Sequence, residues 1–294
     1  MLRIIAALIL LIAAPTARAQ SAQANVDSLL AADRAFAAAA ANAPTPADAL
    51  AAMFDAEVIV PGGPALTIGR DAALALFRAA PAWQSGQVSW RPVRGGVSAD
   101  GTQGFTYGYL AVTAGPAERR ARKYLAYWVR RSEGWRVVAW RQVPHGAEGT
   151  PTAGMTAPSL PGFATAPDPT AVPRHQASLA AAEQAFSDRA QRVGLAAAFR
   201  EYGRADAINL AAGGAAFVTG AEAISAGVDA GGATTSPVRW STQRSVVASS
   251  GDLGVSLGVI RRNQPGTDGS PDAFSFFTIW RRDSPNGPWR YIAE

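Results

Sequence analysis

Two carboxylates occupy equivalent places on two apolar helix faces. Asp33 lies four residues after Leu29 and three before Phe36, on the apolar stripe of a segment with helical spacing. Glu183 follows 150 positions later, with Leu and Phe at the same distances. A carboxylate on a buried face is costly unless it is paired or hydrogen-bonded. Each acid is therefore either an acid–base group of a pocket with a raised pKa or a structural group.

The structural role is favoured, because both segments keep the acid while their surroundings differ. Such a carboxylate would be held by backbone N–H groups or by an arginine from the sheet. The arginines expected as partners are Arg94 and Arg244, or Arg130 and Arg282.

Aromatic residues on predicted strands form a second candidate site. Alternation along a strand allows only some of them to point inward, and Trp and Tyr on strands are usually core residues. The residues expected to line a ligand pocket with Asp33 are Trp90, Tyr107, Tyr109, Tyr124 and Trp128. Leu257 and Val259 replace Tyr107 and Tyr109 in the second half of the chain, so we expect the pocket there to be filled.

Histidine and cysteine are too scarce for much of enzyme chemistry. The two histidines, His145 and His175, flank a proline-rich segment, and there is no cysteine. The sequence therefore predicts no histidine base, no metal site, no thiol nucleophile and no cofactor. The remaining proton-transfer candidates are Asp33, Asp55, Glu57 and the tyrosines.

These residues belong to a domain that is present twice. Residue types recur at a constant offset of 150, which indicates tandem duplication. The recurring residues include Trp90 with Trp240, Arg94 with Arg244, Gly104 with Gly254 and Gly108 with Gly258. We predict domain 1 over 25–143 and a divergent domain 2 over 175–294. Seven prolines in the linker 144–174 predict an extended, exposed segment without packed structure of its own.

Each repeat has helical patterns first and strand patterns last. This order predicts an α+β fold, with three helices packed on a curved antiparallel sheet. In repeat one the expected helices are 26–36, 47–54 and 70–77, and the expected strands are 57–61, 88–98, 105–112, 123–131 and 135–140. The order recurs in repeat two.

Several motifs resemble the DUF4440 branch of the SnoaL-like, NTF2-like superfamily. They are Leu-x-x-x-(Asp/Glu)-x-x-Phe, Gly69-Arg70-Asp71-Ala72, Val88-Ser89-Trp90, and Tyr124-x-x-Tyr127-Trp128-Val129-Arg130 followed by Gly134-Trp135-Arg136. The resemblance implies two cone-shaped α+β barrels, each with a small-molecule pocket at its mouth. It also implies that the two sheets pair as an intrachain pseudo-dimer. The superfamily includes isomerases, cyclases, dehydratases and non-catalytic binding domains, so the fold alone does not assign a reaction.

The first nineteen residues are typical of a signal peptide. Arg3 precedes an apolar run of about ten residues, too short to span a bilayer, and Ala17-Arg18-Ala19 is a typical cleavage site. We expect cleavage near Ala19, a periplasmic or secreted protein, and no stable membrane insertion.

The formal net charge of +5 is spread among acids, which argues against nucleic-acid binding. One basic cluster, Arg119, Arg120, Arg122 and Lys123, falls where two strands connect. We interpret it as a solvated hairpin rather than as a contact for lipid headgroups.

Three functions are compatible with these features. The first is binding of a small apolar or aromatic molecule in the domain 1 cone. The second is a SnoaL- or ketosteroid-isomerase-like enzyme that uses Asp33 as its acid–base group. The third is a non-catalytic pseudo-dimer that serves a protein partner. The position of both histidines at the ends of the linker favours the non-enzymatic functions.

Overall fold

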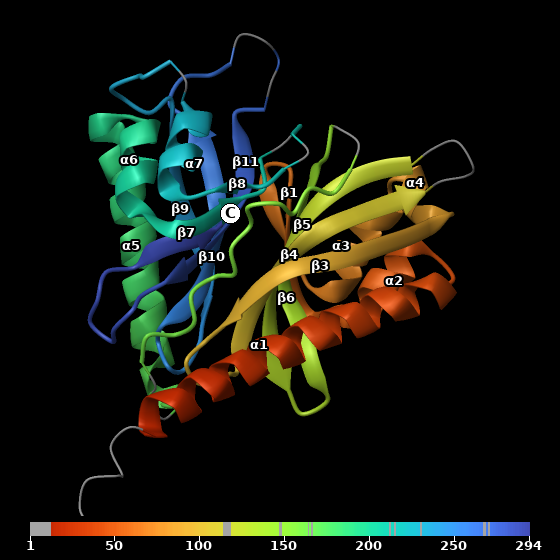
Figure 1. The fold of residues 1–294 in the computed structure, drawn as a ribbon. Helices are drawn as coiled ribbons and strands as arrows, with labels where there is room; N and C mark the ends of the chain where they lie inside the picture. Colours follow the sequence, from red (N-terminus) through yellow and green to blue (C-terminus); the bar gives the residue numbers. More distant parts are fainter. Residues whose placement is uncertain are drawn as a thin grey trace, which may run out of the picture.

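The chain folds into two α+β halves that lie side by side (Figure 1). The computed structural model describes residues 13–294 except 114–118, 147–148, 164, 166, 212, 215, 230, 267–268 and 270. Each half has one six-stranded sheet with helices on one face. The α+β fold class predicted from the sequence is confirmed.

Repeat one has the strand order β2-β1-β6-β5-β4-β3, in which β1 is parallel to β6 and the other neighbours are antiparallel. The long helix α1 crosses β3 and β4, and the later helices cover the rest of the same face. Its elements are α1 (Ala13–Ala39), η1 (Ala40–Asn42), α2 (Pro46–Met53), β1 (Phe54–Gly62), β2 (Ala65–Ile68), α3 (Arg70–Arg78), α4 (Pro81–Gln84), β3 (Gln87–Val97), β4 (Gln103–Thr113), β5 (Arg119–Arg131) and β6 (Gly134–Pro144).

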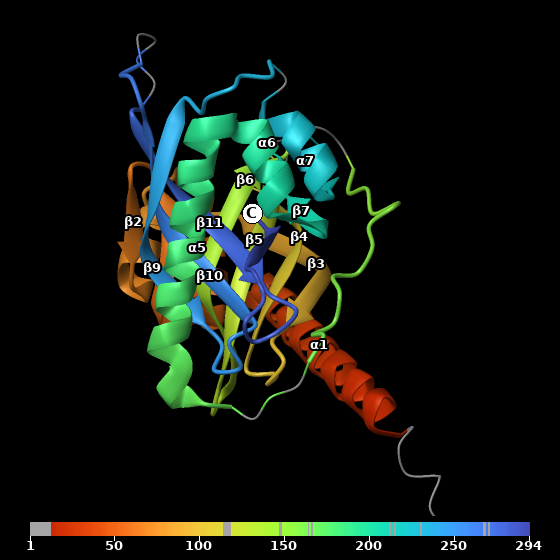
Figure 2. The same cartoon turned by 90° about the vertical axis from the view of Figure 1, so that its left-hand side faces the viewer.

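Repeat two has the same order, β8-β7-β12-β11-β10-β9, again with one parallel pair, β7 and β12. The helix α5 lies across its sheet (Figure 2). Its elements are η2 (Pro169–Ala171), α5 (Val172–Val193), α6 (Leu195–Tyr202), β7 (Gly203–Asn209), β8 (Val218–Thr219), α7 (Ala221–Val228), β9 (Val238–Val247), β10 (Leu253–Arg262), β11 (Ala273–Arg281) and β12 (Arg290–Ala293).

The N-terminal segment is described only from Ala13, where α1 begins. The predicted apolar run of the signal peptide therefore lies largely outside the described residues, and the predicted cleavage position near Ala19 falls within α1. None of the helices in the described part of the chain is both long and apolar enough to cross a membrane.

Both sheets are buried on both faces. The helix-covered faces form two separate cores, one in each repeat. The opposite faces pack against each other and form a third core from strands of both repeats. Hydrogen bonds between turns extend this contact: the Ala99 amide donates to the Asp252 carboxylate, and the Ser249 hydroxyl donates to Asp100 at 2.7 Å.

Lys123 belongs to this interface rather than to a solvated hairpin. It lies in β5 with a fully buried side chain. Its ammonium group donates to the carbonyl oxygens of Ala211, Gly214 and Ala216 at 2.7, 2.8 and 2.9 Å. The hairpin interpretation is therefore wrong for this residue, because the pairing of the two sheets places repeat two over it.

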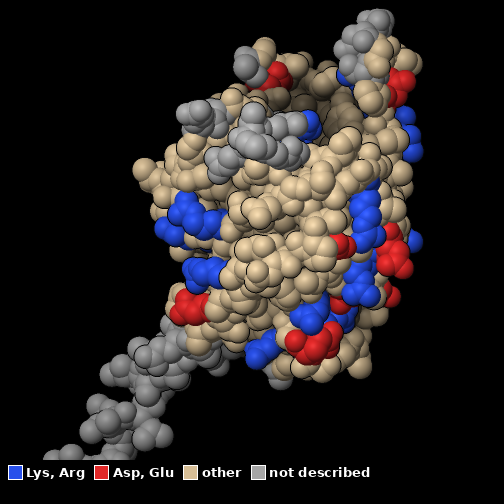
Figure 3. Space-filling view, turned by 90° about the vertical axis from the view of Figure 1, so that its right-hand side faces the viewer, with Lys and Arg blue, Asp and Glu red and all other residues tan. Residues whose placement is uncertain are grey.

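Charges on the outer surface are intermixed. On the face shown in Figure 3, Lys and Arg lie among Asp and Glu around a broad uncharged area. Several arginines form exposed ion pairs, such as Arg78 with Asp48 and Arg200 with Glu222, each at 2.7 Å. Exposed pairs of this kind contribute little to stability.

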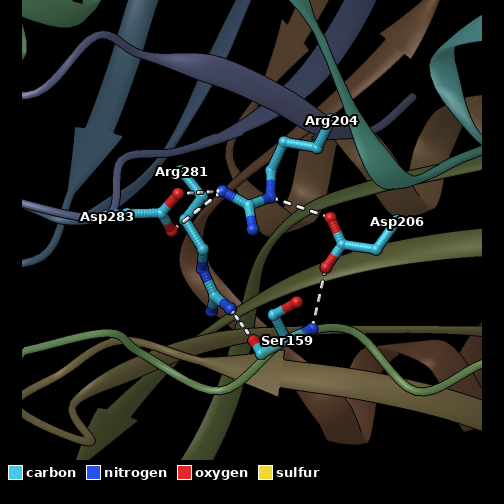
Figure 4. Close-up of polar contacts among 5 residues, drawn as sticks. All are labelled: Ser159, Arg204, Asp206, Arg281 and Asp283. Atoms are coloured by element: carbon cyan, nitrogen blue, oxygen red, sulfur yellow. Dashed lines mark hydrogen bonds and ion pairs between the residues drawn. The ribbon is translucent and has the colours of Figure 1, made fainter.

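Most of the described linker is exposed, but it is hydrogen-bonded to repeat two at Ser159. The Ser159 amide donates to Asp206 at 2.8 Å, and its carbonyl accepts a hydrogen bond from the buried Arg281 (Figure 4). Arg204 bridges Asp206 and Asp283 and so fixes this acceptor. The prediction is wrong at the C-terminal end, since α5 begins at Val172 with a proline in its first turn. Proline is compatible with that position because the first N–H groups of a helix have no partner within it.

We expect Asp206→Ala to raise the rate at which a broad-specificity protease cuts the linker near Ser159 by about tenfold. A hydrogen bond to a charged acceptor contributes about 1.5–3 kcal/mol. Because ~1.4 kcal/mol corresponds to a tenfold change in an equilibrium constant, its loss should raise the population of the locally opened, cleavable linker about tenfold. Mass spectrometry of the fragments checks this. Asp188→Ala, which removes an exposed carboxylate on α5 that accepts a hydrogen bond from Gln184, is the control. Equal cleavage of all three proteins would show that Asp206 does not hold the linker.

Candidate functional site

Asp33 is enclosed in the core of repeat one. Its side chain is 0% exposed, and its two oxygens accept hydrogen bonds from the Trp90 indole at 2.7 Å and the Tyr124 hydroxyl at 2.8 Å. Burial raises the pKa of Asp33, although these donors oppose the rise. The carboxyl group thus has neutral partners and no access to solvent.

The expected arginine partners of Asp33 are wrong. Strict alternation would place Arg94 on the same face of β3 as Trp90, but the register shifts between Pro92 and Arg94. This bulge turns Arg94 to the opposite face, where it donates to the carbonyls of Val93 and Met155. Arg130 is exposed on β5.

Glu183 is held in the same way in repeat two. It accepts from the Trp240 indole at 2.6 Å, the Trp280 indole at 2.8 Å and the Ser256 hydroxyl. Burial again raises its pKa. Its expected arginine partners are also wrong, since Arg244 donates to the Gln243 carbonyl and Arg282 to the Gly251 carbonyl.

The pairing register shows how the two carboxyl sites correspond. Gly104 pairs with Trp128, and Gly254 pairs with Trp280, so the two tryptophans are equivalent. By the same register, Phe276 replaces Tyr124. The longer Glu183 side chain reaches its tryptophan directly. In repeat one, Trp128 instead donates to Thr106 at 2.8 Å.

The aromatic candidates of repeat one do not converge on one site. Trp90, Tyr124 and Trp128 lie on the helix-covered face, with Asp33. Tyr107 and Tyr109 lie on the opposite face, within the contact between the repeats. Placing all five in one pocket is therefore wrong, because alternation along β4 turns its tyrosines away from α1.

Repeat one has a packed interior and an open cleft outside it. Rings fill the interior, as in the stacked pair Phe36 and Trp128, whose centroids are 6.1 Å apart. The cleft, of about 870 Å³, lies where the ends of β3, β4 and β5 meet the start of the linker. Trp90, Tyr109 and His145 are among its lining residues, and the Tyr109 hydroxyl donates to the Pro151 carbonyl at 2.6 Å.

A cavity of about 210 Å³ lies instead in repeat two, where a filled interior was expected. That expectation is wrong because Leu257 and Val259 face the contact between the repeats and not the cone. The cavity has aromatic walls and converging polar groups. Its lining includes Phe186, Trp240, Phe276 and Phe277 as aromatic residues, and Arg141, Glu183, Asn209, Thr278 and Glu294 as polar ones.

The polar end of this cavity is electrostatically unusual. Burial raises the pKa of Glu294 to about 7, although the hydrogen bond from Asn209, at 2.8 Å, and the nearby Arg141 oppose the rise. Burial also lowers the pKa of Arg141. A carboxyl group that titrates near neutrality beside an arginine can bind an anion or transfer a proton.

Sequence reasoning missed Arg141, Asn209 and Glu294. Asn209 ends β7, Glu294 follows β12 and Arg141 lies within β6, places where a polar residue is unremarkable in a sequence. The parallel pairing of β12 with β7 brings Glu294 beside Asn209, and the packing of the two sheets brings Arg141 to them. The only available signal was a polar residue directly after an apolar strand.

The other polar candidates serve structural roles. Burial tends to raise the pKa of Asp55. Hydrogen bonds from Arg131 and from the Glu57 amide outweigh this effect and hold the pKa below its ordinary value. Glu57 itself is exposed. Within the described ranges, no group of three His, Asp or Glu side chains is placed to hold a metal ion.

No family model and no curated protein matches the chain. Solved structures similar to it include several NTF2-like proteins. One is an NTF2-like protein of unknown function from Shewanella oneidensis, 9% identical, with a TM-score of 0.33, covering 40% of this chain and 96% of its own. Another is a ketosteroid isomerase-like protein from Erwinia carotovora, 15% identical, with a TM-score of 0.33, covering 40% and 94%. A third is an NTF2-like protein with a cystatin-like fold from Novosphingobium aromaticivorans, 15% identical, with a TM-score of 0.32, covering 49% and 94%.

Proposed function

We propose that this protein binds a small molecule with an aromatic or apolar body in the cavity of repeat two. The observation that carries the proposal is the combination of aromatic walls with a small set of converging polar groups in one cavity. Ligand sites in proteins typically have this composition. The proposal keeps the ligand class expected from the sequence and moves the site from domain 1 to domain 2.

Catalysis by Asp33 is not favoured by its surroundings. Both of its oxygens already accept hydrogen bonds, and the side chain is fully buried. A second candidate function is proton transfer by Glu294. It is favoured by the pKa of about 7 for this carboxyl group and by its position on the cavity wall.

The experiment that tests binding uses benzyl alcohol, a neutral aromatic molecule of suitable size. We expect saturable chemical-shift changes in the Asn209 side-chain amide and the Thr278 methyl group of isotopically labelled protein. Ala126 is the matched control, because the register makes it the counterpart of Thr278 in repeat one. Changes at Trp90 and Tyr109 alone would place the ligand in the open cleft of repeat one and overturn the proposal.

We also propose that the chain is an exported tandem of DUF4440-type domains. The equivalent carboxylates and tryptophans of the two sheets support the duplication, and the first nineteen residues support export. N-terminal sequencing of protein from the producing cells tests export. A mature chain that still begins at Met1 would contradict it.

A further inference from the structure

We propose that the repeat two cavity selects small monoanions, and that repeat one supplies the anion-binding group, Arg141, across the interface. This inference rests on the proposed function, since it names the ligand class of the same cavity. Arg141 and Val143 come from β6 of repeat one, whereas the other lining residues come from repeat two. The cavity is therefore complete only when the two repeats are docked.

The hydrogen-bonding partners of the polar groups single out Arg141. Glu183 already accepts from two indoles and one hydroxyl. Glu294 accepts from Asn209, whose own oxygen accepts from the Ala211 amide at 2.6 Å. Within the part of the chain that the structure describes, Arg141 has no hydrogen-bond or ion-pair partner. Among the described lining residues, the donors left over are thus the Thr278 hydroxyl and the guanidinium group of Arg141, and only the second is charged.

The charges lead to the same ligand. Arginine stays protonated in proteins, so Arg141 contributes a permanent positive charge. Burial raises the pKa of both Glu183 and Glu294, so that both carboxyl groups tend toward their neutral forms. Arg141 is half-buried and its only charged neighbour given by the structure is Glu294, so an anionic ligand would supply the counter-charge when the Glu294 carboxyl is protonated. A carboxylate also matches the planar fork of a guanidinium group.

Size and shape restrict the ligand further. A cavity of about 210 Å³ restricts the ligand to a small molecule. Aromatic rings from α5, β9 and β11 form much of its wall. A planar monocarboxylate of the size of benzoate fits this volume, and benzamide has the same shape without the charge.

The test compares benzoate with benzamide by calorimetry and by the Asn209 chemical shift. We expect benzoate to bind at least tenfold more tightly at pH 6. Arg141→Met should abolish this preference, and Arg141→Lys should keep part of it. Arg239→Met is the matched control, because it removes an exposed arginine from β9 and should leave the preference unchanged.

The pH dependence provides an independent arm. The groups around Glu294 are Arg141 on β6, Glu183 on α5, Asn209 on β7 and Tyr291 on β12. Ionised Glu294 would compete with the ligand for Arg141. The affinity for benzoate, which stays ionised, should therefore fall as the pH rises through about 7, approaching tenfold per unit at higher pH. Glu294→Gln should remove this fall.

The outcomes separate the two proposals. Equal binding of benzoate and benzamide in the cavity, or a preference that survives Arg141→Met in a folded protein, would overturn anion selection and leave the proposed function intact. If neither benzoate, benzamide nor benzyl alcohol shifts Asn209, both proposals fail. Circular dichroism of each variant shows whether the fold is kept. If Arg141→Met is unfolded, anion selection is judged from the other two variants. Arg141→Lys should show a weaker preference for benzoate than the unmodified protein, and Glu294→Gln should lack its fall in benzoate affinity with pH.

Discussion

Asp33→Ala is expected to lower the free energy of unfolding by about 3–5 kcal/mol. The substitution leaves the Trp90 indole and the Tyr124 hydroxyl without acceptors in the core, and each buried donor without a partner costs about 1–3 kcal/mol. It also opens a cavity in a packed interior, which adds to the loss. Urea unfolding followed by tryptophan fluorescence measures the change.

Repeat two provides the matched comparison. Glu183→Ala should also be destabilising, because it leaves the Trp240 indole unpaired and removes the main acceptor of the Ser256 hydroxyl, while the Trp280 indole keeps its bond to Ser256 at 3.0 Å. The double variant Asp33→Glu with Tyr124→Phe reproduces the arrangement of Glu183 and Phe276 in repeat one. We expect it to lose less stability than the two single variants added together. A loss below about 1 kcal/mol for Asp33→Ala would contradict the structural role.

The pH dependence of stability follows from the same burial. Because the pKa of Asp33 is raised in the folded protein, the native state keeps a proton that the unfolded chain loses above its ordinary pKa of 3.8. This contribution to stability is complete below that pH and is lost as the pH rises through the folded pKa. Asp33→Asn removes the titrating group, so the decline should be absent from its stability profile.

The duplication and the buried acids could be predicted from the sequence because both depend on local patterns. The constant offset of 150 marks equivalent residues, and helical spacing places Asp33 on an apolar face. The partners of Asp33 could not be predicted in the same way. They depend on a one-residue bulge in β3. The bulge turns the Arg94 side chain away from the helix-covered face, whereas the Trp90 side chain stays on that face. A bulge changes which face a residue occupies without any strong signature in its sequence.

The cavity could not be predicted for a different reason. It depends on the volumes of side chains from distant segments, and on Arg141, which comes from the other repeat. In the sequence, Tyr107 and Tyr109 are the residues that distinguish repeat one from repeat two. In the structure both side chains lie in the contact between the repeats and not in the interior of repeat one. A cavity is set by the packing of whole layers, whereas periodicity reports only the face on which each residue lies.

Lys123→Met is the second substitution with a large expected effect. The methionine side chain has a similar length, but it removes the ammonium group that satisfies the carbonyls of Ala211, Gly214 and Ala216. The three carbonyls would lose a charged donor, and because Gly214 and Ala216 are exposed, water would replace part of it, so we expect a cost of about 1–3 kcal/mol. The loss should appear as faster amide hydrogen exchange at Ile208–Leu210 and at Phe217 and Val218, and as weaker docking of the repeats.

Solution scattering tests whether this docking depends on Lys123. We expect the unmodified chain to scatter as a compact monomer, in which the shared core holds the two sheets together. Lys123→Met should increase the radius of gyration or lower the denaturant concentration at which the two repeats separate. Arg130→Met is the control, since it removes an exposed charge from the same strand. If both variants behave like the unmodified chain, the apolar contact alone holds the repeats together, and Lys123 merely closes an interface that forms without it.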